Sequence, residues 1–379
     1  MEILNTSFGE FQLSRFPRRS KELLRAWDAA DEYLLQHIAE EQLINDHSRV
    51  LIINDQFGAL SISLNSYKLE SISDSWIAHA GIKENLLDNS ISPDTIKLHN
   101  SLDYPNEQFD LVIIKVPKSL AMLEDQLIRV KPLLHENSVV LSGAMVKSIH
   151  NSTLKLFEKI IGPTKTSLAK KKARLILPTV DLEVGPASSP YPSNYILENT
   201  EHQITNHAAV FSRDSLDIGT RFFLQHLPVS NSYKKIIDLG CGNGIVGLIA
   251  AEKNPSAELN FVDESFMAVA SAKVNFESAF GEERKAHFLT TDCLKGLPKN
   301  SYDLILNNPP FHQQNVVGDF IAKQMFRESY TALEKGGELW VIGNRHLGYH
   351  VTLKKIFGNC MTIANNKKFV ILKAVKASK

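Results

Sequence analysis

The chain carries the same series of segments twice, and this repeat constrains its fold more than any other feature. Residues 27–38 share Asp, Leu, Gln and His with residues 216–227 at matching positions. Five more pairs of segments follow in the same order: 51–54 with 235–238, 73–75 with 262–265, 109–113 with 302–306, 157–162 with 354–358, and 171–177 with 367–372. Their separation drifts by only a few residues, as loop insertions in a tandem duplication would produce. We therefore expect two copies of one domain.

The join between the copies lies in residues 184–192, which are rich in proline and small side chains. Such a composition is typical of a linker. We predict a first domain over residues 1–185, a linker over 186–199 and a second domain over 200–379.

Within each copy, short Val/Ile/Leu runs alternate with helical stretches, which predicts an α/β fold with a mostly parallel sheet covered on both faces. In the second copy, residues 268–275 have the pattern of a crossover helix. The strands expected there are residues 236–238, 259–263, 286–289, 304–307, 338–342 and 369–374.

Composition excludes several classes of protein. The 379 residues are 43% hydrophobic and 22% charged, with 42 basic and 42 acidic side chains, so disorder, a fibre and a strongly basic nucleic-acid binder are all disfavoured. No apolar run is long enough for a membrane span. The three cysteines, Cys241, Cys293 and Cys360, are too few and too scattered for a disulfide framework or a zinc cluster. We expect a cytoplasmic protein without a bound metal.

The second copy places a glycine-rich loop directly after its first strand. This loop, residues 238–244, has the sequence Asp-Leu-Gly-Cys-Gly-Asn-Gly and precedes a helix. Glycines at such a position let a ligand approach the main chain. Asp263, at the end of the next strand, could accept both hydroxyls of a ribose. The alternative is a tight strand-to-helix turn, but the loop and Asp263 together favour nucleoside binding.

A second motif, Asn308-Pro309-Pro310-Phe311, follows the fourth strand at the sheet edge where ligands bind. An exocyclic amine is a poor nucleophile because its lone pair is delocalised. The Asn308 side-chain oxygen and the Pro309 carbonyl could each accept one of its N–H bonds and so free that lone pair. Phe311 could stack on a planar acceptor. The alternative is a proline turn with Phe311 in the core.

These motifs resemble those of class I S-adenosylmethionine-dependent methyltransferases that modify exocyclic nitrogens. Residues 210–219 and the duplication narrow the resemblance to the bacterial ribosomal RNA methyltransferases G and C, which make N2-methylguanosine in the large-subunit and small-subunit RNA. Residues 29–35, 262–265 and 355–360 look like the large-subunit enzyme. The resemblance therefore implies two tandem Rossmann-like domains and methylation of a guanine N2 in 23S rRNA.

The resemblance also implies roles for individual residues. Asp263 would hold the ribose, and Asp292 would meet the adenine amino group, although a helix-capping aspartate would look alike. Residues 211–220 would close over the cofactor or the base; the alternative is a capped helix start. No general base is evident, although His312 is a candidate. The cradle for the methionyl part of S-adenosylmethionine would comprise Asp238, Gly240, Cys241, Gly242, Asn243 and Gly244, and the amine would be oriented by Asn308, Pro309, Pro310 and Phe311.

The first copy has lost these motifs. Matching residues 51–54 with 235–238 gives it one glycine where the second copy has three, and Lys115 and Lys118 where the second has Asn308 and Phe311. Asp74 is matched with Asp263. We infer a degenerate methyltransferase domain that no longer binds the cofactor, and in the resembling family this half is assigned to RNA binding.

Contact with RNA would depend on local basic clusters, because neither half is basic overall. The candidates fall into three groups: Arg15, Arg18, Arg19 and Lys21; Lys165, Lys170, Lys171, Lys172 and Arg174; and Lys115 with Lys118. Each group could equally be solvated surface.

The expected partner is 23S rRNA, protein-free or in an early assembly intermediate, because a guanine amine inside a duplex is inaccessible. We expect a monomer. The same chemistry on 16S rRNA, a tRNA base or a protein glutamine, and a non-catalytic RNA-binding assembly factor, are the rival hypotheses.

Overall fold

The computed structural model describes residues 2–19, 22–185, 188–310 and 316–377. The chain divides into two compact units, residues 1–191 and 192–379. Residues 193–196, placed in the linker from sequence, form strand β10 (Ser193–Ile196) of the second unit. They do so because they pair with β11 (Gln203–Asn206) in an antiparallel hairpin. The matching hairpin of the first unit is formed by β1 (Glu2–Thr6) and β2 (Gly9–Leu13).

In its described part, the second unit is built on a seven-stranded sheet with the order β14-β13-β12-β15-β16-β18-β17. Six of these strands run in one direction, and β18 runs antiparallel to its neighbours β16 and β17. The strands are β12 (Lys235–Leu239), β13 (Glu258–Asp263), β14 (Ala286–Thr290), β15 (Tyr302–Asn307), β16 (Leu333–Asn344), β17 (Met361–Asn365) and β18 (Phe369–Val375).

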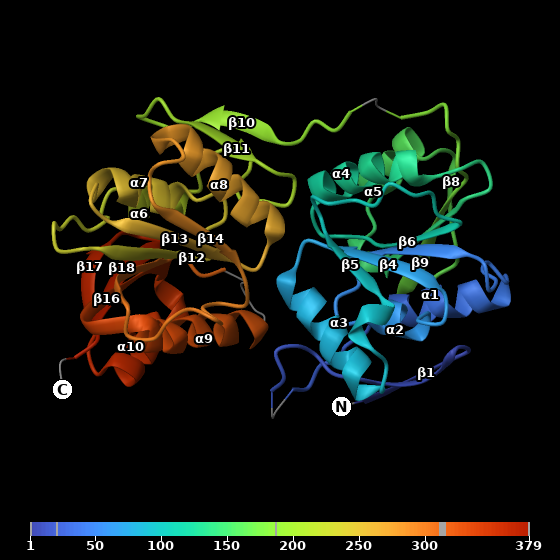
Figure 1. Cartoon of the computed structure of the whole chain (residues 1–379), viewed down its shortest axis with the longest axis horizontal. Coiled ribbons are helices and arrows are strands. Elements are labelled where there is room, and N and C mark those ends of the chain that lie inside the picture. The colour runs from blue at the N-terminus through green and yellow to red at the C-terminus, as the bar shows by residue number, and fades with distance from the viewer. Residues whose placement is uncertain (1, 20–21, 186–187, 311–315, 378–379) are drawn as a thin grey trace. The chain divides into compact units, whose positions relative to one another are not determined.

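Helices cover both faces of this sheet (Figure 1). Successive residues of a strand point to opposite faces, so Ile236 and Ile237 enter two different hydrophobic clusters. The helices α6 to α8 lie on the face of Ile236, and α9 and α10 on the face of Ile237. They are α6 (Ile218–Leu224), α7 (Ile245–Lys253), α8 (Phe266–Phe280), α9 (Val316–Ala332) and α10 (Tyr349–Phe357).

The first unit repeats this architecture with the strand order β5-β4-β3-β6-β7-β9-β8. Its strands are β3 (Arg49–Ile53), β4 (Lys68–Ser73), β5 (Lys97–Asn100), β6 (Leu111–Lys115), β7 (Val139–Met145), β8 (Thr164–Thr166) and β9 (Ala173–Pro178). Its helices are α1 (Ala29–Glu40), α2 (Ala59–Ser63), α3 (Trp76–Asp88), α4 (Leu120–Val130) and α5 (Asn151–Ile160). The identical strand order confirms the predicted tandem duplication and the α/β fold.

A hydrogen bond common to both units fixes how the two copies correspond. The Asp303 Oδ2 atom accepts a bond from the Lys235 backbone N–H at 2.7 Å, and Asp110 Oδ2 accepts one from Arg49 at the same distance. With Asp110 matched to Asp303, the strand register matches Ile52 with Asp238. The sequence comparison matched Asn54 with Asp238 and was therefore wrong by two residues. It had aligned similar residue types, whereas the register aligns the backbones.

Among the described helices, none is long and apolar enough to cross a membrane. The described side chains also contain no group of three or more His, Cys, Asp or Glu residues arranged to hold a metal ion.

Gly244 is a point where the fold of the second unit tolerates no side chain. Its φ is +79°, and a Cβ atom there would lie 2.8 Å from the Ala272 Cβ and 2.9 Å from the Ala272 Cα. Gly358 has nearly the same φ, +78°, with no atom within 4 Å of its Cβ position. Replacing each of these two glycines by alanine therefore separates the cost in stability of the positive φ from the cost of a steric clash.

We predict that Gly244→Ala lowers the free energy of unfolding of the second unit more than Gly358→Ala does. The Gly358 variant pays only the positive-φ cost, about 1 kcal/mol, whereas the Gly244 variant adds a clash of about 1–3 kcal/mol. Urea titration followed by hydrogen exchange of peptides from residues 235–263 measures both. Equal losses would mean that α8 moves away from the loop without cost.

Candidate active site

The glycine-rich loop lies at the carboxyl end of β12, between the ends of β13 and β15. The backbone N–H groups of Gly240 and Cys241 both donate to the Val262 carbonyl, at 2.8 and 3.1 Å. Gly242 has φ +54° and no heavy atom within 4 Å of its Cβ position. The loop thus keeps open space beside its main chain, at the switch point where α/β sheets bind ligands.

Asp238 supports the loop from within the core. Its side chain is buried, and its Oδ2 atom accepts a hydrogen bond from the Gly247 N–H at 2.8 Å, in the first turn of α7. Burial, with a smaller contribution from the nearby Asp263 carboxylate, raises the pKa of Asp238 to about 8. The structure therefore gives the Asp238 Oδ2 atom a contact with the protein backbone at the start of α7.

Asp263 ends β13 and reaches the loop from the other side. Its Oδ2 accepts from the Gly242 N–H at 3.0 Å, and its Oδ1 accepts from the Ser265 N–H at the same distance. Burial raises the pKa of its carboxyl, and these backbone donors oppose that rise. Each oxygen has a further lone pair, so the carboxylate can also accept from the hydroxyls of a ligand.

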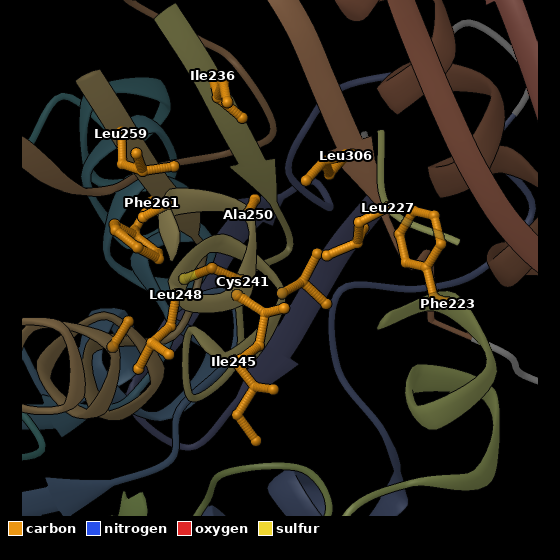
Figure 2. Packing of buried hydrophobic residues seen from close by; sticks show 14 of the residues in the cluster. Phe223, Leu227, Ile236, Cys241, Ile245, Leu248, Ala250, Leu259, Phe261 and Leu306 are labelled. Atoms are coloured by element: carbon orange, nitrogen blue, oxygen red, sulfur yellow. The ribbon is translucent and has the colours of Figure 1, made fainter. Parts of the chain in front are cut away.

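Asn243 belongs to a buried amide network that was not identified from sequence. Its Nδ2 donates to the Asn206 Oδ1 at 2.8 Å, and its carbonyl accepts from the Asn275 Nδ2 at 2.9 Å. Asn206 ends β11 and Asn275 lies on α8, so this network ties the loop to two other elements. Cys241 is buried beside it among apolar side chains, where burial raises the pKa of its thiol (Figure 2).

Asp292 lies beyond the end of β14 and is held from α9. The Gln324 Nε2 donates to both Asp292 carboxylate oxygens, at 3.2 and 3.1 Å, and also to Glu328. The Glu328 Oε2 accepts from the Leu294 N–H at 2.8 Å. Gln324 and Glu328 were not identified from sequence. Their spacing of one helical turn is too common to signal a site.

Asn308 follows β15 and lies beside the start of α6. Its Nδ2 donates to the Thr220 Oγ1 at 3.1 Å, whereas its Oδ1 is buried without a hydrogen-bond partner among the described residues. The preceding Asn307 donates to the Leu239 carbonyl at 2.8 Å and so links β15 to β12. Pro309 is buried and Pro310 is exposed. Phe311 and His312 lie outside the described residues, so the structure does not place them.

The parallel register of β12 and β15 pairs Leu239 with Asn307. It therefore brings the predicted cofactor loop and the predicted acceptor motif to one edge of the sheet. An open backbone loop, two acidic side chains and a buried amide oxygen can together bind a nucleoside and orient an amine.

In the first unit, the matching edge has different chemistry. Ile52 takes the place of Asp238, and Asn54, with φ +68°, takes that of Gly240. The Asp263 position is occupied by Ser73, whose Oγ accepts from the Ser75 N–H as the Asp263 carboxylate accepts from Ser265. The match of Asp74 with Asp263 was therefore wrong by one residue.

Lys115, which matches Asn308, forms an ion cluster with the buried Asp31 and the half-exposed Asp28. Its Nζ donates to Asp28 Oδ1 at 2.9 Å and to Asp31 Oδ1 at 2.6 Å. Burial raises the pKa of Asp31 to about 6, against the opposing effect of Lys115. Lys115 is thus neutralised within its own domain and is poorly placed to contact RNA, whereas Lys118 is exposed.

The other basic candidates lie at the surface of the first unit with partial pairing. Arg15 and Arg18 form ion pairs with Glu22 and Glu84, and Arg18 also pairs with Asp88. Lys171 pairs with Glu32, and Lys170 donates to Gln36. Lys165 and Lys172 are exposed, Arg19 and Arg174 are partly buried, and Lys21 lies outside the described residues.

The fold and this site define a methyltransferase, and comparison with known proteins agrees. The family model described as "Methyltransferase small domain" matches residues 201–373, and that described as "RLMG N-terminal domain" matches residues 1–182. The chain belongs to the ribosomal RNA large subunit methyltransferase G family. A member from Streptomyces griseus is 48% identical over 99% of this chain and all of its own length. One from Pseudoalteromonas translucida is 48% identical over 97% of this chain and 96% of its own.

Among solved structures, the chain is similar to the Thermus thermophilus 16S rRNA N2 methyltransferase RsmC in complex with AdoMet and guanosine. The TM-score is 0.75 at 18% identity, over 99% of this chain and 97% of that one. At this identity the likeness shows the fold. It extends over both units and agrees with two tandem Rossmann-like domains.

Asp238 should make the second unit less stable as the pH rises. The folded protein keeps the Asp238 proton up to a pKa of about 8, while the unfolded chain loses it near the ordinary value of 3.8. Unfolding therefore becomes easier from about pH 4 to about pH 8. We predict that Asp238→Asn flattens this decline by an amount on the order of a few kcal/mol.

Urea unfolding of the second unit between pH 5 and pH 9 measures this effect. Asp214→Asn is the matched control, because the Asp214 side chain is 75% exposed, and it should follow the wild-type curve. A curve of Asp238→Asn parallel to that of the wild type would contradict the assigned pKa.

Lys115 and Lys118 should respond oppositely to the same substitution. We predict that Lys115→Met destabilises the first unit by roughly 3 kcal/mol at pH 7, since Asp28 and Asp31 lose their cation. The loss should shrink near pH 5, where Asp31 can bind a proton. Lys118→Met should leave stability unchanged and weaken RNA binding. Urea unfolding and filter binding to 23S RNA measure the two effects. Normal stability of Lys115→Met would contradict the ion cluster.

Proposed function

We propose that this chain transfers a methyl group from S-adenosylmethionine to the exocyclic N2 of a guanine in 23S rRNA. The observation that carries the proposal is the buried Asn308 Oδ1, which lies beside the cofactor loop with no partner among the described residues. The relatives that are 48% identical are named for methylation of large-subunit ribosomal RNA, which favours this substrate.

The residues present suit the methyl donor. The open main chain at Gly242 gives a ligand close access to the loop, and Asp263 and Asp292 offer carboxylate oxygens to the ribose and the adenine amine. When bound, S-adenosylmethionine supplies a methyl group on a sulfonium ion, whose S–C bond breaks as the new N–C bond forms.

The chain's own contribution is to position the acceptor and to accept hydrogen bonds from it. Asn308 Oδ1 and the Pro309 carbonyl each take one N–H of the guanine amine, which draws the nitrogen towards tetrahedral geometry and directs its lone pair at the methyl carbon. The nitrogen then releases one proton to solvent. Phe311 is proposed to stack on the base.

The first unit is proposed to bind RNA, since its sheet edge lacks the glycine loop, the ribose carboxylate and the acceptor amide. Lys118, Lys170, Lys171 and Lys172 are its exposed basic side chains of interest. The assignment of RNA binding to the first unit and of catalysis to the second is part of this proposal, as is a monomeric state.

The decisive experiment supplies labelled S-adenosylmethionine with protein-free 23S and 16S RNA, followed by nucleoside analysis. We expect N2-methylguanosine in 23S RNA only. Label in 16S RNA alone would move the substrate to the small subunit. No label in either RNA, in assembled particles or in protein would leave a non-catalytic RNA-binding factor.

Substitution of Asn308 separates catalysis from binding. We predict that Asn308→Ala lowers the rate of methyl transfer at least about 100-fold, because the amine loses a preorganised acceptor. Its affinity for RNA should stay within about twofold. Asn231→Ala, in an exposed loop of the same unit, is the control and should behave as the wild type. Methyl transfer by Asn308→Ala at the normal rate would overturn this role.

A further inference from the structure

The orientation of the Asn308 amide decides whether this residue can act on an amine. A carboxamide presents an acceptor oxygen at one end and donor N–H groups at the other, and the two ends have nearly the same shape. Only an oxygen that no donor of the protein occupies can accept from the substrate, and Asn308 Oδ1 is such an oxygen among the described residues. Some interaction must therefore prevent the amide from turning over.

Thr220 provides that interaction. Its Oγ1 accepts from the Asn308 Nδ2 at 3.1 Å. The same hydroxyl donates to the Asp217 Oδ2 at 3.4 Å, and the Thr220 backbone N–H donates to that oxygen at 2.9 Å. A hydroxyl has one proton. Because the Asp217 carboxylate accepts this proton, the Thr220 oxygen can only accept a hydrogen bond from Asn308. The Nδ2 end of the Asn308 amide, which carries the donors, must therefore face Thr220.

Packing holds this short series of hydrogen bonds in place. Asp217 is the N-cap residue of α6, and a Cβ atom at Gly219 would lie 2.9 Å from the Asp217 Oδ2 and 3.0 Å from the Phe369 ring. Phe223, one turn beyond Thr220, is fully buried in the core cluster that also contains Leu306 of β15 (Figure 2). The helix start therefore has little freedom to move relative to the end of β15.

The first unit supplies an independent comparison at the same positions. Asp28 caps α1 as Asp217 caps α6, and Asp31 and Lys115 stand where Thr220 and Asn308 stand. Here the pair is an ion pair of 2.6 Å. The helix residue and the residue after the strand therefore differ together between the two copies. This indicates that the two positions act as a pair in both.

We propose that Thr220, held by Asp217, is a positioning residue that fixes the Asn308 amide with Oδ1 directed at the acceptor amine. The proposal rests on the proposed function, because it assigns the purpose of the fixed oxygen. It requires the Thr220 hydroxyl and not merely its volume.

Three variants of the full-length chain test this requirement. Thr220→Val keeps the shape and the backbone cap but removes the hydroxyl, so we expect kcat to fall roughly 10- to 100-fold while KM for RNA and the affinity for S-adenosylmethionine stay near wild type. Thr220→Ser restores the hydroxyl and should restore kcat to within about threefold. Thr200→Val removes a hydroxyl that bonds the Leu197 carbonyl in the same unit and should change nothing.

A second readout does not depend on activity. In protein labelled with ¹⁵N at asparagine, the Asn308 side-chain amide is assigned by its loss in Asn308→Ala. Its protons should exchange more slowly with water in the wild type and Thr220→Ser than in Thr220→Val. Equal exchange, or an unchanged kcat in Thr220→Val, would overturn the proposal. A wild type that methylates nothing but shows this exchange pattern would instead reject the proposed function and keep the amide orientation.

Discussion

The pairing of β12 with β15 is the constraint on which the site depends, and side-chain contacts clamp it at both ends. At the amino ends, the Asp303 carboxylate accepts from the backbone N–H groups of Lys234 and Lys235. At the carboxyl ends, the Asn307 amide donates to the Leu239 carbonyl. Because these contacts fix the register, the chain leaves β15 beside the glycine loop. Asn308, the next residue, therefore lies at that edge of the sheet.

The first unit keeps equivalent clamps while its site chemistry has changed. Asp110 accepts from the Arg49 N–H, and the Asn54 amide donates to the Lys115 carbonyl at 2.9 Å. A carboxylate still holds the first turn of the following helix: Asp55 Oδ2 accepts from the Ser61 N–H at 2.8 Å, as Asp238 accepts from Gly247. The contacts that hold the strands and the following helix are thus kept in both units, although the residues at the proposed ligand site differ.

Much of this organisation could be predicted from the sequence, because it follows from hydrophobic runs and motifs that are each formed by residues close together in the chain. The duplication, the parallel strands of the second copy, the loop and the Asn308 motif are of this kind. The matching of the two copies near Asn54 and Asp74 failed because residue type and backbone register disagree there. A similar polar residue had moved by one or two positions, and only hydrogen bonds such as that of Ser73 with Ser75 reveal it.

Contacts between elements that are far apart along the chain could not be predicted from the sequence, for a different reason. The amide network of Asn206, Asn243 and Asn275 joins a hairpin, a loop and a helix, and no spacing along the chain encodes it. The same holds for Gln324 and Asp292. The hairpins β1–β2 and β10–β11 were missed because their short strands alternate too few residues to give a clear period.

The two copies differ most in how fully their buried polar groups are satisfied at the end of the central strand pair. In the first unit, Lys115 has two carboxylate partners, so the position is closed by charge pairing within the domain. In the second, Asn308 Oδ1 is buried without a partner among the described residues, which costs a folded protein about 1–3 kcal/mol. At the matching position of the first unit, the Lys115 ammonium leaves no such unpaired atom. In the second unit this unpaired oxygen lies at the carboxyl edge of the sheet beside the glycine loop, where we propose that a substrate amine satisfies it.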